Sequence, residues 1–190
     1  MKQLFIGVPI QSEPALKIAD RWSHDSLLNL NRMVWINPTT WHVTLFFLGA
    51  TPESQVAILE QLIGKAFSDL QPFTSQLSGV GMFPEMGKPR VIWMGLDNLQ
   101  PLNAGYALLA ELLLKNEFLF DPKPLKPHLT VARVKSLTNR GPLESLIQEY
   151  QSFNFGEIDI NRVTLFESIS TPAGVMYEPL YEKWLLNVYL

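Results

Sequence analysis

The stretch "WHVTLFFLG", residues 41–49, is the part of the chain from which both the fold and a site can be predicted. It is a largely apolar run, yet it contains a histidine followed two positions later by a threonine. The stretch "PHLTVARV", residues 127–134, repeats this order, with its histidine 86 residues after the first. Side chains of a β-strand alternate between its faces, so each histidine shares a face with its threonine. We therefore predict two strands with polar fronts, one carrying His42 and Thr44 and the other His128 and Thr130.

The apolar residues between these polar ones are expected to face the interior. Val43, Leu45 and Phe47 would anchor the first strand. Leu129 and Val131 would anchor the second strand in the same way. If the two polar fronts face each other across a cleft, two imidazoles and two hydroxyls converge on a rigid support.

Such a convergence suits in-line attack at phosphorus. The pKa of histidine, about 6.5, lets one imidazole accept a proton from the entering oxygen while another donates one to the leaving oxygen. Threonine hydroxyls can donate to phosphate oxygens. A single His-x-Thr is more often structural, but two of the three histidines share this pattern, which favours a functional site. The residues alone leave open which histidine is the acid.

The other candidate ligands have simpler interpretations. His24 lacks the motif, and we interpret it as a surface or helix-packing residue. A two-histidine metal site would need further ligands such as Asp159 or Glu167, because neither motif contains a carboxylate or a cysteine. We therefore predict no metal at this site.

Hydrophobic periodicity predicts an alternation of strands and helices. Short connections favour antiparallel pairing, and a similar order of elements around each motif indicates a duplicated unit. We expect an α+β fold whose two lobes form a single domain over residues 1–190. Helices are expected at 12–31, 51–67, 101–116 and 141–150, strands at 2–10, 33–36, 42–48, 73–83, 90–96, 128–134, 153–160, 162–170, 175–180 and 183–190, and a stiff extended segment at the proline-rich residues 121–127.

Composition limits the class of protein. With 47% hydrophobic residues the chain is expected to be globular, and the absence of cysteine excludes a disulfide scaffold and agrees with a cytoplasmic location. No run is long and apolar enough for a membrane span. Residues 1–14 lack a small-residue cleavage site, so we interpret them as a first strand rather than a signal peptide.

Charge is unevenly distributed. The net charge of −3 argues against sequence-independent coating of nucleic acid. Residues 121–140 nevertheless carry a net +4, so the rest of the chain carries −7. This segment could hold a phosphate, but on charge alone we interpret it as a solvated loop. Its basic residues are Lys123, Lys126, Arg133, Lys135 and Arg140.

The two His-x-Thr segments resemble the signatures of the 2H phosphoesterase superfamily. The nearest branch is the bacterial and archaeal RNA 2',3'-cyclic phosphodiesterases, also called LigT-like or 2'-5' RNA ligase proteins. Three further segments are similar to this branch and extend the resemblance over nearly the whole chain: "QLFIGVPI", "GVGMFPEMGKPRVIWMGL" and "RVTLFESISTPAGVMYEPL".

The resemblance implies a bilobal fold with two antiparallel sheets flanked by helices around a central cleft. It implies that His42 donates a proton to the leaving 3' oxygen and that His128 accepts one from water. Thr44 and Thr130 would hold the phosphate. The implied partner is RNA with a 2',3'-cyclic phosphate end or a small cyclic-phosphate nucleotide. The product would be a 2'-phosphomonoester, made without metal or cofactor. Apart from the resemblance, we expect a cytoplasmic monomer that does not bind membranes.

Arg133 matches an arginine of that family, but its position raises a problem. It lies five residues after His128, which puts it on the opposite face of a regular strand. It reaches the cleft only if the strand bulges, ends or twists, and a salt bridge elsewhere is the alternative. A base could stack on Phe83 or Trp41, although we favour interior packing for both rings.

Two other functions remain open at the level of sequence. The same chemistry could act on 2'-5' linked oligonucleotides or join RNA halves through a 2'-5' bond. A protein that binds RNA ends without catalysis could use the same cleft, although binding alone does not explain two groups able to exchange protons.

Overall fold

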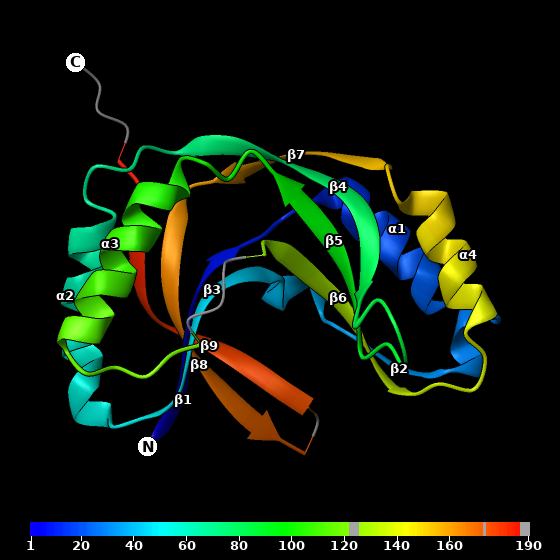
Figure 1. Cartoon of the computed structure of the whole chain (residues 1–190), viewed down its shortest axis with the longest axis horizontal. Helices are drawn as coiled ribbons and strands as arrows, with labels where there is room; N and C mark the ends of the chain where they lie inside the picture. Colours follow the sequence, from blue (N-terminus) through cyan, green and yellow to red (C-terminus); the bar gives the residue numbers. More distant parts are fainter. Residues whose placement is uncertain (122–125, 173, 187–190) are drawn as a thin grey trace.

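The computed structural model describes residues 1–121, 126–172 and 174–186 (Figure 1). The helices are α1 (Glu13–Ser23), α2 (Val56–Ala66), α3 (Leu102–Lys115) and α4 (Gly141–Tyr150), with short 3-10 turns at Leu28–Leu30, Pro38–Thr40 and Glu53–Gln55. The strands are β1 (Lys2–Pro9), β2 (Arg32–Trp35), β3 (His42–Thr51), β4 (Phe73–Phe83), β5 (Val91–Asp97), β6 (His128–Ser136), β7 (Asn154–Ile160), β8 (Arg162–Thr171) and β9 (Gly174–Trp184).

The strands form a sheet in the order β7-β4-β5-β6-β3-β1-β8-β9, with β2 paired to β6. Every pairing is antiparallel, which confirms the predicted α+β class. The two expected sheets are joined into one, because β3 and β6 pair at Val43 and Leu129. The two motif strands are therefore neighbours at the centre of the sheet.

Each half of the sheet carries its own pair of helices. In one half, α1 packs against β7 and α4 against β4. In the other half, α2 packs against α3, β8 and β9. Figure 1 shows the two helix pairs on opposite sides of the molecule with the curled strands between them. This arrangement is the bilobal duplicated unit that the sequence pattern indicates.

Local side-chain contacts explain where two helices depart from the prediction. α1 starts at its predicted cap, since the Ser12 hydroxyl accepts from the Ala15 amide at 3.3 Å. It ends at Ser23 rather than continuing to residue 31, because the Asp25 carboxylate accepts from the amides of Leu27 and Leu28 at 2.7 and 3.0 Å and starts a new turn. α2 begins at Val56 rather than residue 51, since β3 extends through residue 51.

The ends of two predicted segments lie outside the described residues. The predicted strands at residues 175–180 and 183–190 merge into β9, and residues 187–190 are not described. Residues 122–125 of the proline-rich segment are not described either, so its expected stiffness stays a prediction. In the part of the chain that the structure describes, no helix combines the length and apolar character that crossing a membrane requires.

The strands β3 and β6 carry the same irregularity three residues after their histidines. On β3, Thr44 pairs with Gly7 and Phe46 with Ile6, which leaves Leu45 without a partner on β1. On β6, Thr130 pairs with Trp93 and Ala132 with Ile92, which leaves Val131 without a partner on β5. Each extra residue is a β-bulge, and beyond it the strand's side chains change face.

The bulge makes one sequence prediction wrong. Val43 and Leu45 are buried as expected, at 1% and 6% exposure. Phe47 was expected beside them in the interior but is 57% exposed, and Phe46 is buried in its place. The reason is the unpaired residue at Leu45, which shifts the alternation by one position.

Candidate active site

The two His-x-Thr motifs meet in one pocket. His42 and Thr44 reach it from β3, and His128 and Thr130 from the adjacent β6. Arg133 lines the same pocket. The structure thus brings together all five residues that the sequence nominated. The remaining lining residues are Ile36, Thr40 and Tyr177.

Both imidazoles are oriented by the same backbone contact. Nδ1 of His42 lies 2.8 Å from the carbonyl oxygen of Thr40, and Nδ1 of His128 lies 2.7 Å from that of Lys126. A carbonyl oxygen can only accept, so Nδ1 carries the hydrogen in each ring. Nε2 of each ring is left free to gain or lose a proton, which is the tautomer that acid–base catalysis requires.

Aromatic rings flank each histidine. The ring of His42 lies 4.7 Å from Phe5 and 5.0 Å, edge to face, from Tyr177. The ring of His128 lies 5.1 Å from Phe83, also edge to face. Phe83 in turn stacks on Trp93 at 5.1 Å. These contacts restrict the tilt of both imidazoles.

The packing interpretation of Phe83 and Trp41 agrees with the structure. Phe83 is half-buried and makes its contacts with Trp93 and His128. Trp41 is 3% exposed and belongs to the hydrophobic core. Trp41 therefore presents no ring face to a base, and Phe83 serves as part of the wall behind His128.

The surroundings favour the neutral form of His42. Burial lowers its pKa from the usual 6.5, and the hydrogen bond to the Thr40 carbonyl partly opposes this effect. The positive charge of Arg133, and that of His128 whenever its ring is protonated, lower the pKa further. An anion placed among these three groups would counter the repulsion and favour protonation of His42.

Arg133 enters the cleft because β6 bulges at Val131. The extra residue returns Arg133 to the face that carries His128 and Thr130, which resolves the parity problem of the five-residue offset. Among the described residues no carboxylate forms an ion pair with Arg133, so the alternative of a structural salt bridge finds no partner there. Its guanidinium is available to bind an anion.

Tyr177 is the pocket residue that the sequence did not nominate. It lies on β9 opposite Ser168 of β8, and its ring meets the edge of His42. The signal was present in "GVMYEPL", which resembles a family segment. Nothing in the sequence placed that hairpin beside β3, because its position depends on the pairing of β1 with both β3 and β8.

The remaining candidates lie elsewhere. His24 is exposed at the end of α1, with Nδ1 2.9 Å from the Asp20 carbonyl, as expected for a surface residue. Glu167 accepts from Nζ of Lys2 at 2.5 Å, and Asp159 sits on β7 opposite Thr74. Over residues 1–121, 126–172 and 174–186, no three His, Cys, Asp or Glu side chains gather as a metal site would need.

Comparison with known proteins identifies the family. The model of the 2'-5' RNA ligase superfamily matches residues 19–171. The chain belongs to the 2'-5' RNA ligase superfamily. A relative of this superfamily from Archaeoglobus fulgidus, named RNA 2',3'-cyclic phosphodiesterase, is 36% identical over 146 residues, which are 76% of this chain and 80% of the relative. The expected resemblance to 2H phosphoesterases is thereby confirmed.

Solved structures of other proteins share the whole fold. TT0787 of Thermus thermophilus is 26% identical, with a TM-score of 0.77 over 96% of this chain and 97% of that one. LigT of E. coli, at 21% identity, has a TM-score of 0.77 over 98% of this chain and 99% of that one. The LigT-like arrangement predicted from the sequence is therefore confirmed at the level of fold.

Proposed function

We propose that this member of the 2'-5' RNA ligase superfamily hydrolyses RNA 2',3'-cyclic phosphate ends to 2'-phosphomonoesters, without a metal or cofactor. One observation carries the proposal: two histidines from separate halves of the sheet line one pocket, and each is held by a carbonyl so that Nε2 is free. The name of the Archaeoglobus relative supports the same substrate.

The proposed reaction uses the five pocket residues that the sequence nominated. Nε2 of His128 takes a proton from water as the water oxygen attacks phosphorus. The bond from phosphorus to the 3' oxygen breaks, and Nε2 of His42 gives its proton to that oxygen. Thr44, Thr130 and Arg133 bind the non-bridging phosphate oxygens. The pocket volume of ≈ 40 Å³ suits a group as small as one phosphate.

The role of His42 as donor requires a proton that the pocket by itself disfavours. Burial and the positive charge of Arg133 lower its pKa, and a bound phosphate would offset that charge. Protonation of His42 is therefore proposed to accompany substrate binding. In 2'-5' joining, which the family name describes, a 5' hydroxyl would attack phosphorus in place of water, and His42 would again donate its proton to the leaving 3' oxygen.

We propose that residues 1–190 act as one functional domain. Neither half contains both histidines, since β3 and β6 belong to different halves of the sheet. We propose that the protein acts as a monomer in the cytoplasm, on RNA ends or on small cyclic-phosphate nucleotides.

The test is turnover of a short RNA that ends in a 2',3'-cyclic phosphate, with the product identified by ³¹P NMR. We expect a 2'-phosphate and no effect of EDTA. His42→Gln and His128→Gln are each expected to lower kcat by about 10²–10⁴-fold, because each removes one proton transfer. His24→Gln is the matched control, since His24 is exposed directly after the end of α1. Circular dichroism checks that all variants fold.

Three results would overturn the proposal. A 3'-phosphate product would contradict the assignment of the leaving oxygen, and loss of activity in EDTA would contradict metal independence. Tight binding of the RNA without any product would identify an end-binding protein. A parallel series with 2'-5' linked oligonucleotides decides whether that linkage is the better substrate.

A further inference from the structure

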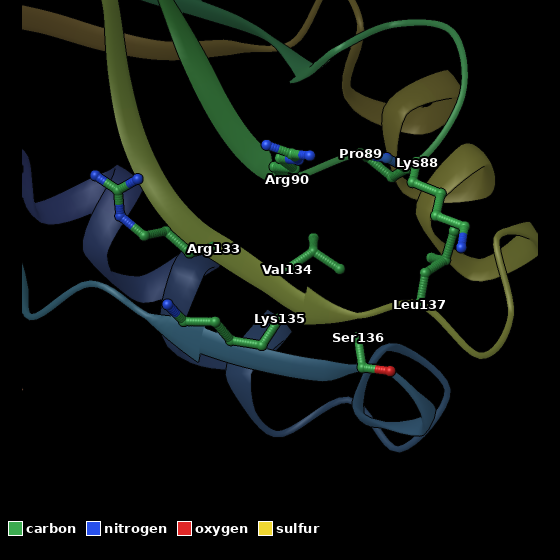
Figure 2. A pocket seen from close by; sticks show the side chains of 8 residues that line it. All are labelled: Lys88, Pro89, Arg90, Arg133, Val134, Lys135, Ser136 and Leu137. Carbon is green, nitrogen blue, oxygen red and sulfur yellow. The ribbon is translucent and has the colours of Figure 1, made fainter.

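A second hollow, which we call the basic groove, opens beside the pocket. Figure 2 shows its lining: Lys88, Pro89, Arg90, Arg133, Val134, Lys135, Ser136 and Leu137. Its volume of ≈ 510 Å³ far exceeds that of the pocket, but it contains no imidazole. Arg133 lines both, so the groove leads directly away from the proposed position of the cyclic phosphate.

Resting on the proposed function, we propose that the basic groove binds the backbone phosphates that precede the cyclic end of the RNA. The enzyme then selects oligonucleotides over cyclic mononucleotides. The phosphates concerned are the one or two on the 5' side of the terminal nucleotide.

Strand geometry aligns the cations with the pocket. Beyond the bulge at Val131, alternation puts Arg133 and Lys135 on the face that His128 and Thr130 occupy before it. Two residues of strand span about 6–7 Å, close to the separation of successive phosphates in a nucleic-acid strand. Figure 2 shows both side chains extending to the same side of β6, with Arg90 opposite them at the start of β5.

The charge of the groove is not neutralised. In the described part of the chain, Lys88, Arg90, Arg133 and Lys135 form no ion pair, and no carboxylate lines the groove. The net charge of the protein is −3, so this is a local concentration of cations on an acidic chain. Such a local field attracts a polyanion to one place on the surface.

The other half of the molecule lacks the equivalent cations. On β3 the residues five and seven positions after the histidine are Phe47 and Gly49, where β6 has Arg133 and Lys135. Lys2 of β1 is held by Glu167 at 2.5 Å. At these equivalent positions the duplicated fold is therefore asymmetric in charge, with cations on β6 and none on β3. This asymmetry would give the bound RNA a single direction through the cleft.

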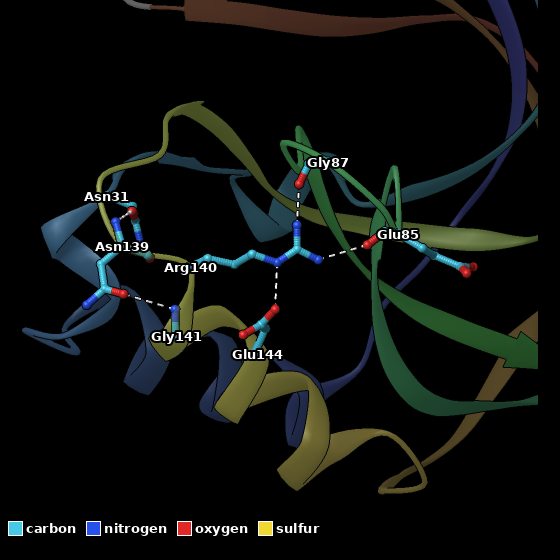
Figure 3. A network of polar contacts seen from close by, with 7 residues as sticks. All are labelled: Asn31, Glu85, Gly87, Asn139, Arg140, Gly141 and Glu144. Carbon is cyan, nitrogen blue, oxygen red and sulfur yellow. Dashed lines mark hydrogen bonds and ion pairs between the residues drawn. The ribbon is translucent and has the colours of Figure 1, made fainter.

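Arg140 holds one wall of the groove in place through the contacts that Figure 3 shows. The Arg140 guanidinium donates to the carbonyls of Glu85, at 2.9 Å, and Gly87, which belong to the loop that carries Lys88. Its Nε donates to Glu144 at 2.6 Å, so its own charge is paired. Arg140 therefore acts as a brace rather than a phosphate ligand, and the groove is formed before RNA arrives.

A buried asparagine holds the base of this brace. Asn31 is 2% exposed, and its side-chain oxygen accepts from the amides of Thr138 and Asn139 at 2.8 and 2.9 Å. Its side-chain nitrogen donates to the Asn139 carbonyl at 2.8 Å. The connection between β6 and α4 is thereby fixed, and with it the position of Arg140.

The basic residues of segment 121–140 thus have different roles. Arg133 and Lys135 line the groove, Arg140 braces it, and the carbonyl of Lys126 orients His128. Lys123 lies outside the described residues. The expectation of a loop is wrong for Arg133 and Lys135, because both lie on β6.

The experiment compares four substrates that differ by their phosphates. They are adenosine 2',3'-cyclic phosphate, its 5'-phosphorylated form, and the di- and tetranucleotides with the same cyclic end. We expect kcat/KM to rise by about tenfold or more over the first one or two added phosphates and then to level off. Log kcat/KM for the tetranucleotide should also fall more steeply with log salt than for the mononucleotide.

Two substitutions that each remove one positive charge test whether the groove causes the preference for longer substrates. Lys135→Gln and Arg90→Gln should each lower the tetranucleotide-to-mononucleotide ratio of kcat/KM by about threefold or more, and each should reduce the salt slope by about 0.7. Lys65→Gln is the matched control, because Lys65 is exposed on α2 in the other half of the molecule. Its ratio and slope should equal those of the wild type.

The outcomes separate this inference from the proposed function. Equal kcat/KM for all four substrates, or a Lys135→Gln variant that behaves like Lys65→Gln, overturns the groove but leaves the cyclic phosphodiesterase intact. If no substrate is turned over, the proposed function fails. Fluorescence anisotropy with a tetranucleotide ending in a 2'-phosphate then still decides the groove: weaker binding by Lys135→Gln than by Lys65→Gln supports it, and equal binding refutes it.

Discussion

At the scale of single residues, the pocket combines a cation, Arg133, with two histidines. Arg133 and His128 both lower the pKa of His42, while the carbonyls of Thr40 and Lys126 keep Nδ1 protonated in each ring. The pocket is therefore prepared for an anion. Binding of a phosphate relieves the repulsion among these groups and supplies the condition under which His42 can donate a proton.

Substitution of Arg133 tests this electrostatic coupling. Arg133→Gln removes one of the positive charges, so the pKa of His42 should rise toward its usual value, although burial still holds it down. Arg133→Lys keeps the charge and should leave the titration of His42 near that of the wild type. The measurement is an NMR titration of the histidine side chains. Identical titration in the wild type and Arg133→Gln would show that the guanidinium does not act on His42.

At the scale of elements, the site depends on close contact between neighbouring strands. Trp93 of β5 lies across Gly81 of β4, stacks on Phe83 and reaches the edge of His128 at 6.4 Å. The indole fits only because residue 81 has no side chain. A Cβ at that position would lie 2.1 Å from the Trp93 ring, far inside van der Waals contact.

Gly81→Ala is therefore expected to displace Trp93 and lower the free energy of unfolding by about 1–3 kcal/mol, which urea denaturation measures. Turnover should fall as well, because the wall behind His128 moves. Gly141→Ala is the control, since its Cβ would meet only the Asn139 side-chain oxygen, at 3.3 Å, at the start of α4. If both variants unfold at the same urea concentration, the close contact between Gly81 and Trp93 does not contribute to the free energy of unfolding.

At the scale of the whole molecule, the cleft exists because two similar halves meet along β3 and β6. Backbone pairing between these strands is limited to Val43 and Leu129. Beyond that pair the strands diverge, so their polar faces border an opening rather than a continuous sheet. The halves match in fold but differ in charge, because Arg133 and Lys135 on β6 have no charged counterpart on β3.

Global stability should report the burial of His42. Its pKa is lowered in the folded state, so below about pH 6.5 the unfolded state binds more protons than the folded state. The stability that this residue contributes is fully present above about pH 6.5. It is lost as the pH falls through the lowered pKa that His42 has in the folded state. Urea denaturation at about pH 7.5 and about pH 5.5 should show a larger loss for the wild type than for His42→Gln. Equal losses would mean that folding does not disfavour the imidazolium.

Much of the fold could be predicted because its signals are local. The strand at residues 73–83 and the helix at 141–150 agree with β4 and α4 to the residue, since periodicity and flanking turns lie within each segment. The prediction failed where a side chain or a partner strand intervened. Asp25 ended α1 early, and the bulge at Leu45 turned Phe47 outward.

The sequence by itself determined which residues form the strands and that each histidine shares a face with its threonine, because the alternation of side chains along a strand is a local property. Only the tertiary structure decided that Arg133 returns to that face, since the bulge at Val131 exists only through pairing with β5. Only the tertiary structure brought Tyr177 to His42, and Lys88 and Arg90 to Lys135. These placements depend on contacts between segments distant in the chain, which no local pattern encodes.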